Sequence, residues 1–222
     1  MPTSTVEDYA KVIYALQQDA PTGEATVVRI AATLGVTKGS VTSMVRKLRD
    51  AGLVDAERYG GIILTPTGER LALDVIRRHR LIEVFLVEVL GFDWSEVHEE
   101  AERLEHAMSG KLLDRLDEFL GRPAIDPHGD PIPDAKGRIA DRTGEPLDQL
   151  ERGTRCLVAS VGDQDPAFLD FAGRHGLRPG VRVSIVDVTP EAESMQIKAH
   201  RASPVSLSFA AARKILVTRT DA

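Results

Sequence analysis

Two short helical stretches joined by a tight turn constrain the fold of this chain more than any other feature. Residues 27–34 carry apolar side chains at helical spacing and are followed by Gly35, and a second stretch, 37–52, begins at Thr37. The small Ala31, the glycine turn and the threonine cap are the ingredients of a helix-turn-helix, in which two helices pack at a steep angle. Any small three-helix unit contains a similar pair, so both interpretations stay open at this point.

The second helix of this pair is expected to present polar and basic side chains to the solvent. Short hydroxyl side chains and long basic ones suit contacts with the base edges and phosphates of double-stranded DNA. The candidate DNA-binding residues on this helix are Thr37, Lys38, Ser40, Thr42, Ser43, Arg46 and Lys47.

Two apolar-rich segments within residues 53–65, separated by Gly60 and Gly61, predict a β-hairpin directly after the second helix. A hairpin at this place forms a wing, and Arg58 on it is a further candidate phosphate contact. Basic residues outnumber acidic ones between residues 29 and 80, although the whole chain has a formal net charge of −6. This split is typical of a chain with one domain for an anionic partner and another for cations.

A longer helix, or two helices in succession, is predicted from about Thr67 to Leu90. Its second half carries aliphatic residues on more than one face, which favours burial on more than one side and makes a dimer interface plausible. His79 and Glu83 lie one helical turn apart on it and form a pair able to share one cation.

The segment Val97–Met108 gathers ionisable side chains along one side of a predicted helix. At about 100° per residue, one stripe contains the apolar Val97, Ala101, Leu104 and Met108. The stripe beside it contains His98, Glu102, Glu105 and His106. Ionisable groups against apolar surface cost free energy unless something pairs them, and a divalent cation would do so directly. A solvated acidic face explains the same pattern, and this helix alone does not decide between the two.

The single cysteine, Cys156, excludes an internal disulfide and a thiolate-rich zinc cluster. A metal ion would therefore be held by oxygen and nitrogen atoms. We expect Cys156 itself to be a small apolar residue of a strand.

The second half of the chain differs in character from the first. Glycine, proline and aspartate mark residues 121–146 as a linker, and we expect His128 within it to lie at the surface. From about Leu147 onward, short β-rich runs predict a small barrel. The runs are 155–161, 181–188, 195–199 and 214–218, with a helix expected at 166–175.

Other classes of protein find less support. No stretch has the pattern of a membrane or secretory segment, so we expect a cytoplasmic protein. A metallohydrolase could use the same carboxylate and histidine cluster, but His98 to Glu102 does not match the His-Glu-x-x-His pattern, and no Ser/His/Asp arrangement is apparent. We therefore expect no enzyme. A DNA-binding regulator that senses an organic ligand, with the histidines as satisfied core groups, remains an alternative.

Five motifs in order resemble the diphtheria-toxin-repressor family of metal-dependent transcriptional regulators, in the long form with a C-terminal SH3-like (FeoA-like) domain. The motifs are Glu7–Tyr9, Leu64–Gly68, Arg78–Glu83, Glu105–His106 and Pro127–Pro133. The resemblance covers nearly the whole chain and implies a mainly α fold with a β-rich C-terminal domain. It implies a winged helix-turn-helix DNA-binding domain, a helical metal-binding and dimerisation domain, a linker and an SH3-like domain at 1–73, 74–140, 141–152 and 153–222.

The resemblance also implies a homodimer that binds double-stranded operator DNA when Fe(II) or Mn(II) is bound, with repression of metal-uptake genes as the usual role. The resemblance implies two metal sites per chain, whose ligands correspond to individual residues of this sequence. One would use Asp8, Glu102, Glu105 and His106. The other would use His79, Glu83 and His98, with Asp163 added from the C-terminal domain.

The choice of metal depends on two of these positions. Iron-selective relatives place a methionine and a cysteine where this chain has Asp8 and Glu102, whereas manganese-responsive relatives place carboxylates at both. Because oxygen-rich, thiol-free ligands suit the harder cation, we expect Mn(II), with Fe(II) as the alternative. Short manganese regulators carry a further carboxylate at the position of Lys11, and a charged lysine cannot bind a cation. Since His98 follows the iron-responsive arrangement, the ligand set resembles a hybrid.

Overall fold

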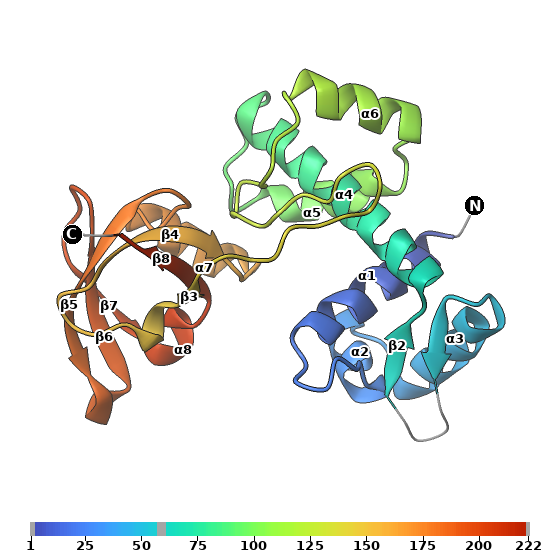
Figure 1. Ribbon diagram of the computed structural model, residues 1–222, viewed down its shortest axis with the longest axis horizontal. Helices are drawn as coiled ribbons and strands as arrows, with labels where there is room; N and C mark the ends of the chain where they lie inside the picture. Colours follow the sequence, from blue (N-terminus) through green and yellow to red (C-terminus); the bar gives the residue numbers. More distant parts are fainter. Residues whose placement is uncertain (1–2, 57–60, 221–222) are drawn as a thin grey trace. The chain divides into compact units, whose positions relative to one another are not determined.

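The structure of the protein is a computed structural model, and it describes residues 3–56 and 61–220 (Figure 1). The chain divides into two compact units. The first consists of Met1–His79 with Pro133–Ile139, and the second of Arg80–Ile132 with Ala140–Ala222. Among the described residues, no helix has both the length and the apolar character needed to cross a membrane.

The first unit contains the predicted helix-turn-helix, formed by α2 (Val27–Leu34) and α3 (Lys38–Asp50). Gly35 follows α2 in the left-handed conformation with φ of 64°, which glycine adopts without the steric cost of a side chain. The hydroxyl oxygen of Thr37 accepts a hydrogen bond from the backbone N–H of Ser40 at 3.1 Å and so caps the start of α3. The predicted pair of helices is confirmed.

The wing is formed by two short antiparallel strands, β1 (Val54–Ala56) and β2 (Ile62–Leu64). Residues 57–60, and with them the candidate phosphate contact Arg58, lie outside the described residues. One apolar core buries the inner sides of α1 (Ser4–Gln18), the helix-turn-helix and both strands. This core holds α3 so that its polar side stays exposed.

The long helix α4 (Pro66–Glu88) has 23 residues and runs along the chain from the first unit into the second. Pro66 is its first residue, where the missing N–H costs nothing because no helical acceptor lies before it. In the first unit, Arg78 Nη2 of α4 lies 3.1 Å from Glu7 Oε1 of α1, and both side chains are nearly buried. Breaking such a pair would leave a buried charge, so it ties α4 to α1.

The helical part of the second unit adds α5 (Val97–Glu105) and α6 (Gly110–Phe119) to the second half of α4. A small apolar cluster joins α4 and α5 through Ile82, Leu86, Val97 and Ala101. The helix α5 ends earlier than the predicted segment Val97–Met108, and His106 is its C-cap residue.

The rest of the second unit is a six-stranded antiparallel sheet with the order β3-β8-β4-β5-β6-β7. Its strands are β3 (Glu145–Pro146), β4 (Arg155–Val161), β5 (Arg182–Thr189), β6 (Ser194–Ala199), β7 (Val205–Ser208) and β8 (Ile215–Arg219). Short helices connect them: η1 (Leu147–Gln149), α7 (Pro166–Arg174), η2 (Pro190–Ala192) and α8 (Phe209–Ala212). The four predicted strands are present, and β3 and β7 were not predicted.

The core of the sheet extends to the helical part of the second unit through Trp94, which is 2% exposed and packs with the sheet residues. The loop after α6 also reaches β4, since the backbone N–H of Val161 donates to the carbonyl oxygen of His128 at 2.8 Å. Next to it, Gly129 has φ of 89°, and a side-chain carbon there would lie 2.1 Å from the Ala159 carbonyl oxygen. Only glycine fits this approach.

Candidate metal centre

The helix α5 places its histidine and glutamate side chains as helical spacing predicts for residues four apart. His98 Nε2 lies 3.7 Å from Glu102 Oε1, one turn further along. At the end of the helix, His106 Nε2 lies 3.5 Å from Glu105 Oε1. These four side chains thus form two neighbouring pairs of an imidazole and a carboxylate.

The buried side of α5 differs from the predicted apolar stripe at one position. Leu104 was expected to be buried, but it is 45% exposed. The adjacent Glu105 is 0% exposed and takes its place on the inner side. A buried carboxylate must be balanced by cations or hydrogen-bond donors, and the imidazole of His106 is one such neighbour of Glu105.

The carboxylate of Glu83 on α4 lies between two imidazoles. Its Oε1 atom is 3.5 Å from Nδ1 of His98, and its Oε2 atom is 3.8 Å from Nδ1 of His128. Glu83 is 1% exposed. The side chain therefore offers both of its oxygen atoms to groups that also bind divalent cations.

His128 was expected at the surface, and this prediction is wrong, because the residue is 3% exposed. Its imidazole stacks on Trp94 with ring centroids 5.4 Å apart, and its Nε2 lies 2.8 Å from the Trp94 carbonyl oxygen. Ligand atoms of Glu83, Asp126 and His128 all lie within 4.8 Å of one another. This group is a possible cation site that the sequence interpretation missed.

A local signal for this group exists in the sequence Asp126–Asp130. One carboxylate oxygen of Asp126 accepts hydrogen bonds from the backbone N–H groups of His128 at 2.8 Å and Asp130 at 3.0 Å. Aspartate followed by proline and glycine favours such turns. The pattern predicts a fixed turn rather than a loose linker, but it does not predict which element covers it.

The electrostatics of this turn reflect its burial. Burial, together with the nearby carboxylates of Glu83 and Asp130, raises the pKa of Asp126 to about 7, although Arg80 Nε lies 3.3 Å from its carboxylate. Burial alone would lower the pKa of His128, but the nearby carboxylate of Glu83, whose Oε2 lies 3.8 Å from Nδ1, outweighs burial and raises it. Such a cluster of acidic groups is able to exchange protons for a cation.

The remaining predicted ligands belong to other elements of the chain. Asp8 is on α1 and His79 on α4, both within the first unit, and His79 lies one turn before Glu83 along the helix. Asp163 lies after β4 and is paired with the ammonium group of Lys214. Among the described residues, Asp163 belongs to none of the groups of histidine and acidic side chains close enough to hold one ion.

The polar side of α3 carries the candidate DNA-binding residues. Its inner side is formed by the buried Val41, Val45 and Leu48. The exposed residues are Thr37, Lys38, Ser40, Thr42, Ser43, Arg46 and Lys47. This exposed face matches the chemistry of a nucleic-acid interface.

The donor set of the second unit fits a first-row divalent cation. Carboxylate oxygens and imidazole nitrogens are the only side-chain ligands in its candidate groups, and the one cysteine is buried at 0% exposure in β4. Hard oxygen donors suit Mn(II), and imidazole also suits Fe(II).

Comparisons with known proteins cover almost the whole chain. Residues 1–62 match the family described as iron dependent repressor, N-terminal DNA binding domain, and residues 65–134 match its metal binding and dimerisation domain. Residues 145–219 match the FeoA domain.

Individual relatives and a solved structure are similar to this chain over large parts of its length. The HTH-type transcriptional regulator MntR of Lysinibacillus sphaericus is 39% identical over 120 residues, which are 54% of this chain and 84% of that protein. The iron-dependent repressor IdeR of Mycobacterium bovis is 39% identical over 129 residues, which are 58% of this chain and 55% of that protein. A solved structure described as a manganese-dependent transcriptional repressor in complex with manganese has 36% identity and a TM-score of 0.89, covering 97% of this chain and 100% of that one.

Proposed function

The chain belongs to the iron-dependent repressor family, and from this premise we propose that it is a Mn(II)-dependent repressor of transcription that binds operator DNA as a homodimer. Its relatives are transcriptional repressors, so the chain is a regulator rather than an enzyme. The observation that carries the choice of metal is the set of buried and half-buried carboxylates and imidazoles, without a thiolate, on α4 and α5. Such a repressor acts on chromosomal DNA, so we infer that the protein is localised in the cytoplasm.

The proposed first site combines Asp8 with Glu102, Glu105 and His106. Asp8 enters through the family resemblance, and the short distance between Glu105 and His106 supports the rest of the set. A carboxylate rather than a thiolate at Glu102 favours Mn(II) over Fe(II).

The proposed second site uses His79, Glu83 and His98. Asp126 and His128, which are both buried, lie close enough to Glu83 to be two further candidate ligands. Asp163 remains a candidate from the C-terminal domain, for which it would have to leave Lys214.

The consequence for DNA binding follows from where the ligands lie. A divalent cation bound here would add positive charge beside the buried carboxylates of Glu83 and Glu105. Asp8 belongs to α1 of the DNA-binding part and Glu105 to α5, so ligation by both would limit the movement of one against the other. DNA that favours the same arrangement should in turn tighten metal binding.

Exposed apolar side chains on the helices of the second unit support dimerisation. Leu104 on α5 and Leu112 and Phe119 on α6 are 45%, 55% and 69% exposed. Large apolar side chains that stay exposed in one copy lose this contact with water when a second copy covers them. We place the dimer contact on these helices, within the part that matches a metal binding and dimerisation domain.

We assign one function to each domain, using the predicted domain boundaries. DNA binding belongs to residues 1–73, metal binding and dimerisation to 74–140, a linker to 141–152 and the SH3-like domain to 153–222. On the DNA, α3 would enter the major groove. The proposed base contacts are Thr37, Lys38, Ser40, Thr42 and Ser43, and the proposed phosphate contacts are Arg46, Lys47 and Arg58.

The test begins with the selection of DNA duplexes from a random pool by the purified full-length protein in the presence of Mn(II). Affinity for a selected duplex is then measured by fluorescence anisotropy with Mn(II), Fe(II), Zn(II) or a chelator. We expect tight binding with Mn(II) and loss of binding with the chelator. Binding restored by Fe(II) alone would favour the iron-responsive alternative, and equal binding with and without chelator would contradict metal dependence.

A further inference from the structure

The C-terminal sheet carries a basic cavity that the proposed function does not use. The cavity has a volume of about 560 Å³ and opens at one end of β4, β5 and β6. Its polar lining includes Ser184 and Thr220, and its basic lining consists of Arg155, Arg182, Lys198, His200 and Arg201. Asp and Glu are absent from its lining among the described residues. For a chain with a net charge of −6, this concentration of positive charge is unexpected.

The strand register explains why these side chains gather on one face. Arg155 of β4 pairs with Ser184 of β5, which pairs with Lys198 of β6, so the three residues form a row across the sheet. Arg182 lies two residues before Ser184 and therefore points to the same face. His200 continues β6 beside Arg182, since its backbone N–H donates to the Arg182 carbonyl oxygen at 2.9 Å.

The cationic groups of this face form no ion pair within residues 3–56 and 61–220. These groups are Arg155, Arg182, Lys198 and Arg201. Arginines elsewhere on the same domain are paired, as Arg174 is with Asp170 at 2.6 Å. Arg201 also has a φ of 63°, a left-handed backbone conformation that costs free energy for a residue with a side chain.

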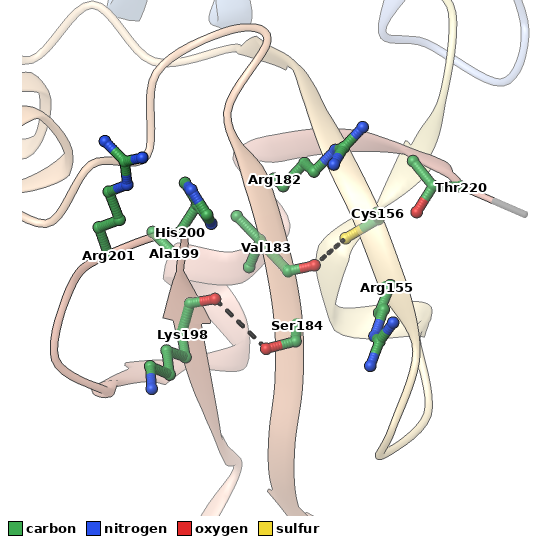
Figure 2. Close-up of a pocket in the computed structure, with 10 residues that line it drawn as sticks. All are labelled: Arg155, Cys156, Arg182, Val183, Ser184, Lys198, Ala199, His200, Arg201 and Thr220. Carbon is green, nitrogen blue, oxygen red and sulfur yellow. Dashed lines mark hydrogen bonds between the residues drawn. The ribbon is translucent and has the colours of Figure 1, made fainter. Parts of the chain in front are cut away.

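The arrangement of the cations indicates the shape of the ligand. Figure 2 shows Arg155 and Arg201 on opposite sides of the cavity, with Arg182 and Lys198 between them. Neighbouring strands are about 4.8 Å apart, so the Cα atoms of Arg155 and Lys198, two strands apart, are separated by about 10 Å. Cations spread over this width suit a row of negative charges better than a single phosphate group.

We propose that this basic face, consisting of Arg155, Arg182, Lys198 and Arg201, binds the phosphate backbone of double-stranded DNA without reading its sequence. The inference rests on the proposed function, because a protein held at an operator by its DNA-binding domain keeps its C-terminal domain at a high local concentration near DNA. Basic side chains facing a row of phosphates release bound counterions, which makes affinity fall steeply with salt. The C-terminal domain would thus add affinity at any sequence that the first domain selects.

The test compares two double variants of the full-length protein that remove the same charge. Arg182→Ala with Lys198→Ala removes two cations of the basic face. Arg152→Ala with Arg174→Ala removes two from the same domain whose side chains are 77% and 69% exposed and which pair with exposed aspartates. Affinity for a 30-base-pair duplex of arbitrary sequence is measured with Mn(II) at several salt concentrations, after circular dichroism has established that both variants are folded.

We expect the dependence of log affinity on log salt to become less steep in the basic-face variant, by about 0.9 for each phosphate group that its side chains no longer neutralise. The control variant should keep the wild-type slope, and Arg182→Lys should largely retain it. Equal slopes for the two double variants would overturn the inference. So would saturable binding of ATP or inorganic phosphate at the cavity with an unchanged DNA slope.

The proposed function and this inference fail in different ways. If the wild-type protein binds no DNA with any metal, both are contradicted. If it binds DNA with Mn(II) and the basic-face variant behaves as the control, only the inference is contradicted.

Discussion

The imidazole of His128 joins a buried carboxylate to the backbone of another segment: its Nδ1 lies 3.8 Å from Glu83 Oε2, and its Nε2 lies 2.8 Å from the Trp94 carbonyl oxygen. A carbonyl oxygen can only accept, so Nε2 carries the proton in this contact. A raised pKa of His128 favours a proton on Nδ1 as well, where it faces Glu83. His128 thus contacts one carboxylate oxygen of Glu83, which is a proposed metal ligand.

The first prediction concerns this contact. His128→Ala removes a buried ring and leaves Glu83 with one partner fewer, so we expect the free energy of unfolding to fall by about 3 kcal/mol. The measurement is urea unfolding of the metal-free protein. His200→Ala, at an exposed histidine of the same unit, should change stability by less than about 0.5 kcal/mol. A decrease no larger than that of this control would mean that His128 does not support the buried cluster.

The second prediction concerns the fully buried carboxylate of α5. Glu105→Gln keeps the size of the side chain but removes its charge, so we expect the affinity for Mn(II) to fall at least about tenfold. At a Mn(II) concentration of 100 times the wild-type Kd, binding stabilises the wild type by about 2.7 kcal/mol and should stabilise the variant by about half as much.

Thermal unfolding with and without Mn(II) measures this difference. The matched control is Glu99→Gln on the same helix, whose side chain is 71% exposed and pairs with Arg103. An unchanged response of Glu105→Gln to Mn(II) would remove Glu105 from the proposed first site.

The third prediction concerns the start of α3. Thr37→Ala removes the hydroxyl that accepts from the Ser40 N–H, and the loss of this cap should destabilise the DNA-binding part by about 1 kcal/mol. Hydrogen exchange of the α3 amides in the absence of DNA measures the effect without involving DNA contacts. Thr37→Ser keeps the hydroxyl and should retain most of the protection. Equal protection in wild type and Thr37→Ala would contradict the capping role.

The fourth prediction concerns Cys156. Burial raises the pKa of its thiol from 9.0 to about 11, so the thiolate fraction near pH 8 is about a hundredfold smaller than for an ordinary cysteine. We expect a thiol reagent such as DTNB to react with the unfolded chain within minutes and with the native protein far more slowly. Because the unfolded thiol ionises first as pH rises, this residue should also lower the free energy of unfolding between about pH 9 and 11. Rapid labelling of the native protein would show that β4 opens readily.

Local signals were sufficient to predict the helix-turn-helix. Gly35 and Thr37 act through their own backbone and hydroxyl groups within four residues, so their effect does not depend on the rest of the fold. The strand β7 (Val205–Ser208) was not predicted, because its alternation of apolar and polar residues extends over only four residues. Its conformation comes from pairing with β6.

Burial was harder to predict than helix position. Leu104 and Glu105 are neighbours on α5, and the pattern of apolar residues placed the leucine inside and the glutamate at the edge. The structure has the reverse, with exposures of 45% and 0%. Which side of a helix is buried depends on the elements that pack on it, and the sequence of the helix alone does not identify these elements. The same reason applies to His128, which is in contact with Trp94 and Glu83, two residues far away in the sequence.

The position of Trp94 has an optical consequence. It is the only tryptophan of the chain, so the intrinsic fluorescence excited at long wavelength comes from one place. The indole stacks on His128 on one side, and the guanidinium carbon of Arg178 lies 4.8 Å from its ring centroid. One imidazole therefore separates the emitting ring from Glu83. We expect a metal ion at the proposed second site to change the fluorescence of Trp94, so that occupancy could be followed without attaching a dye.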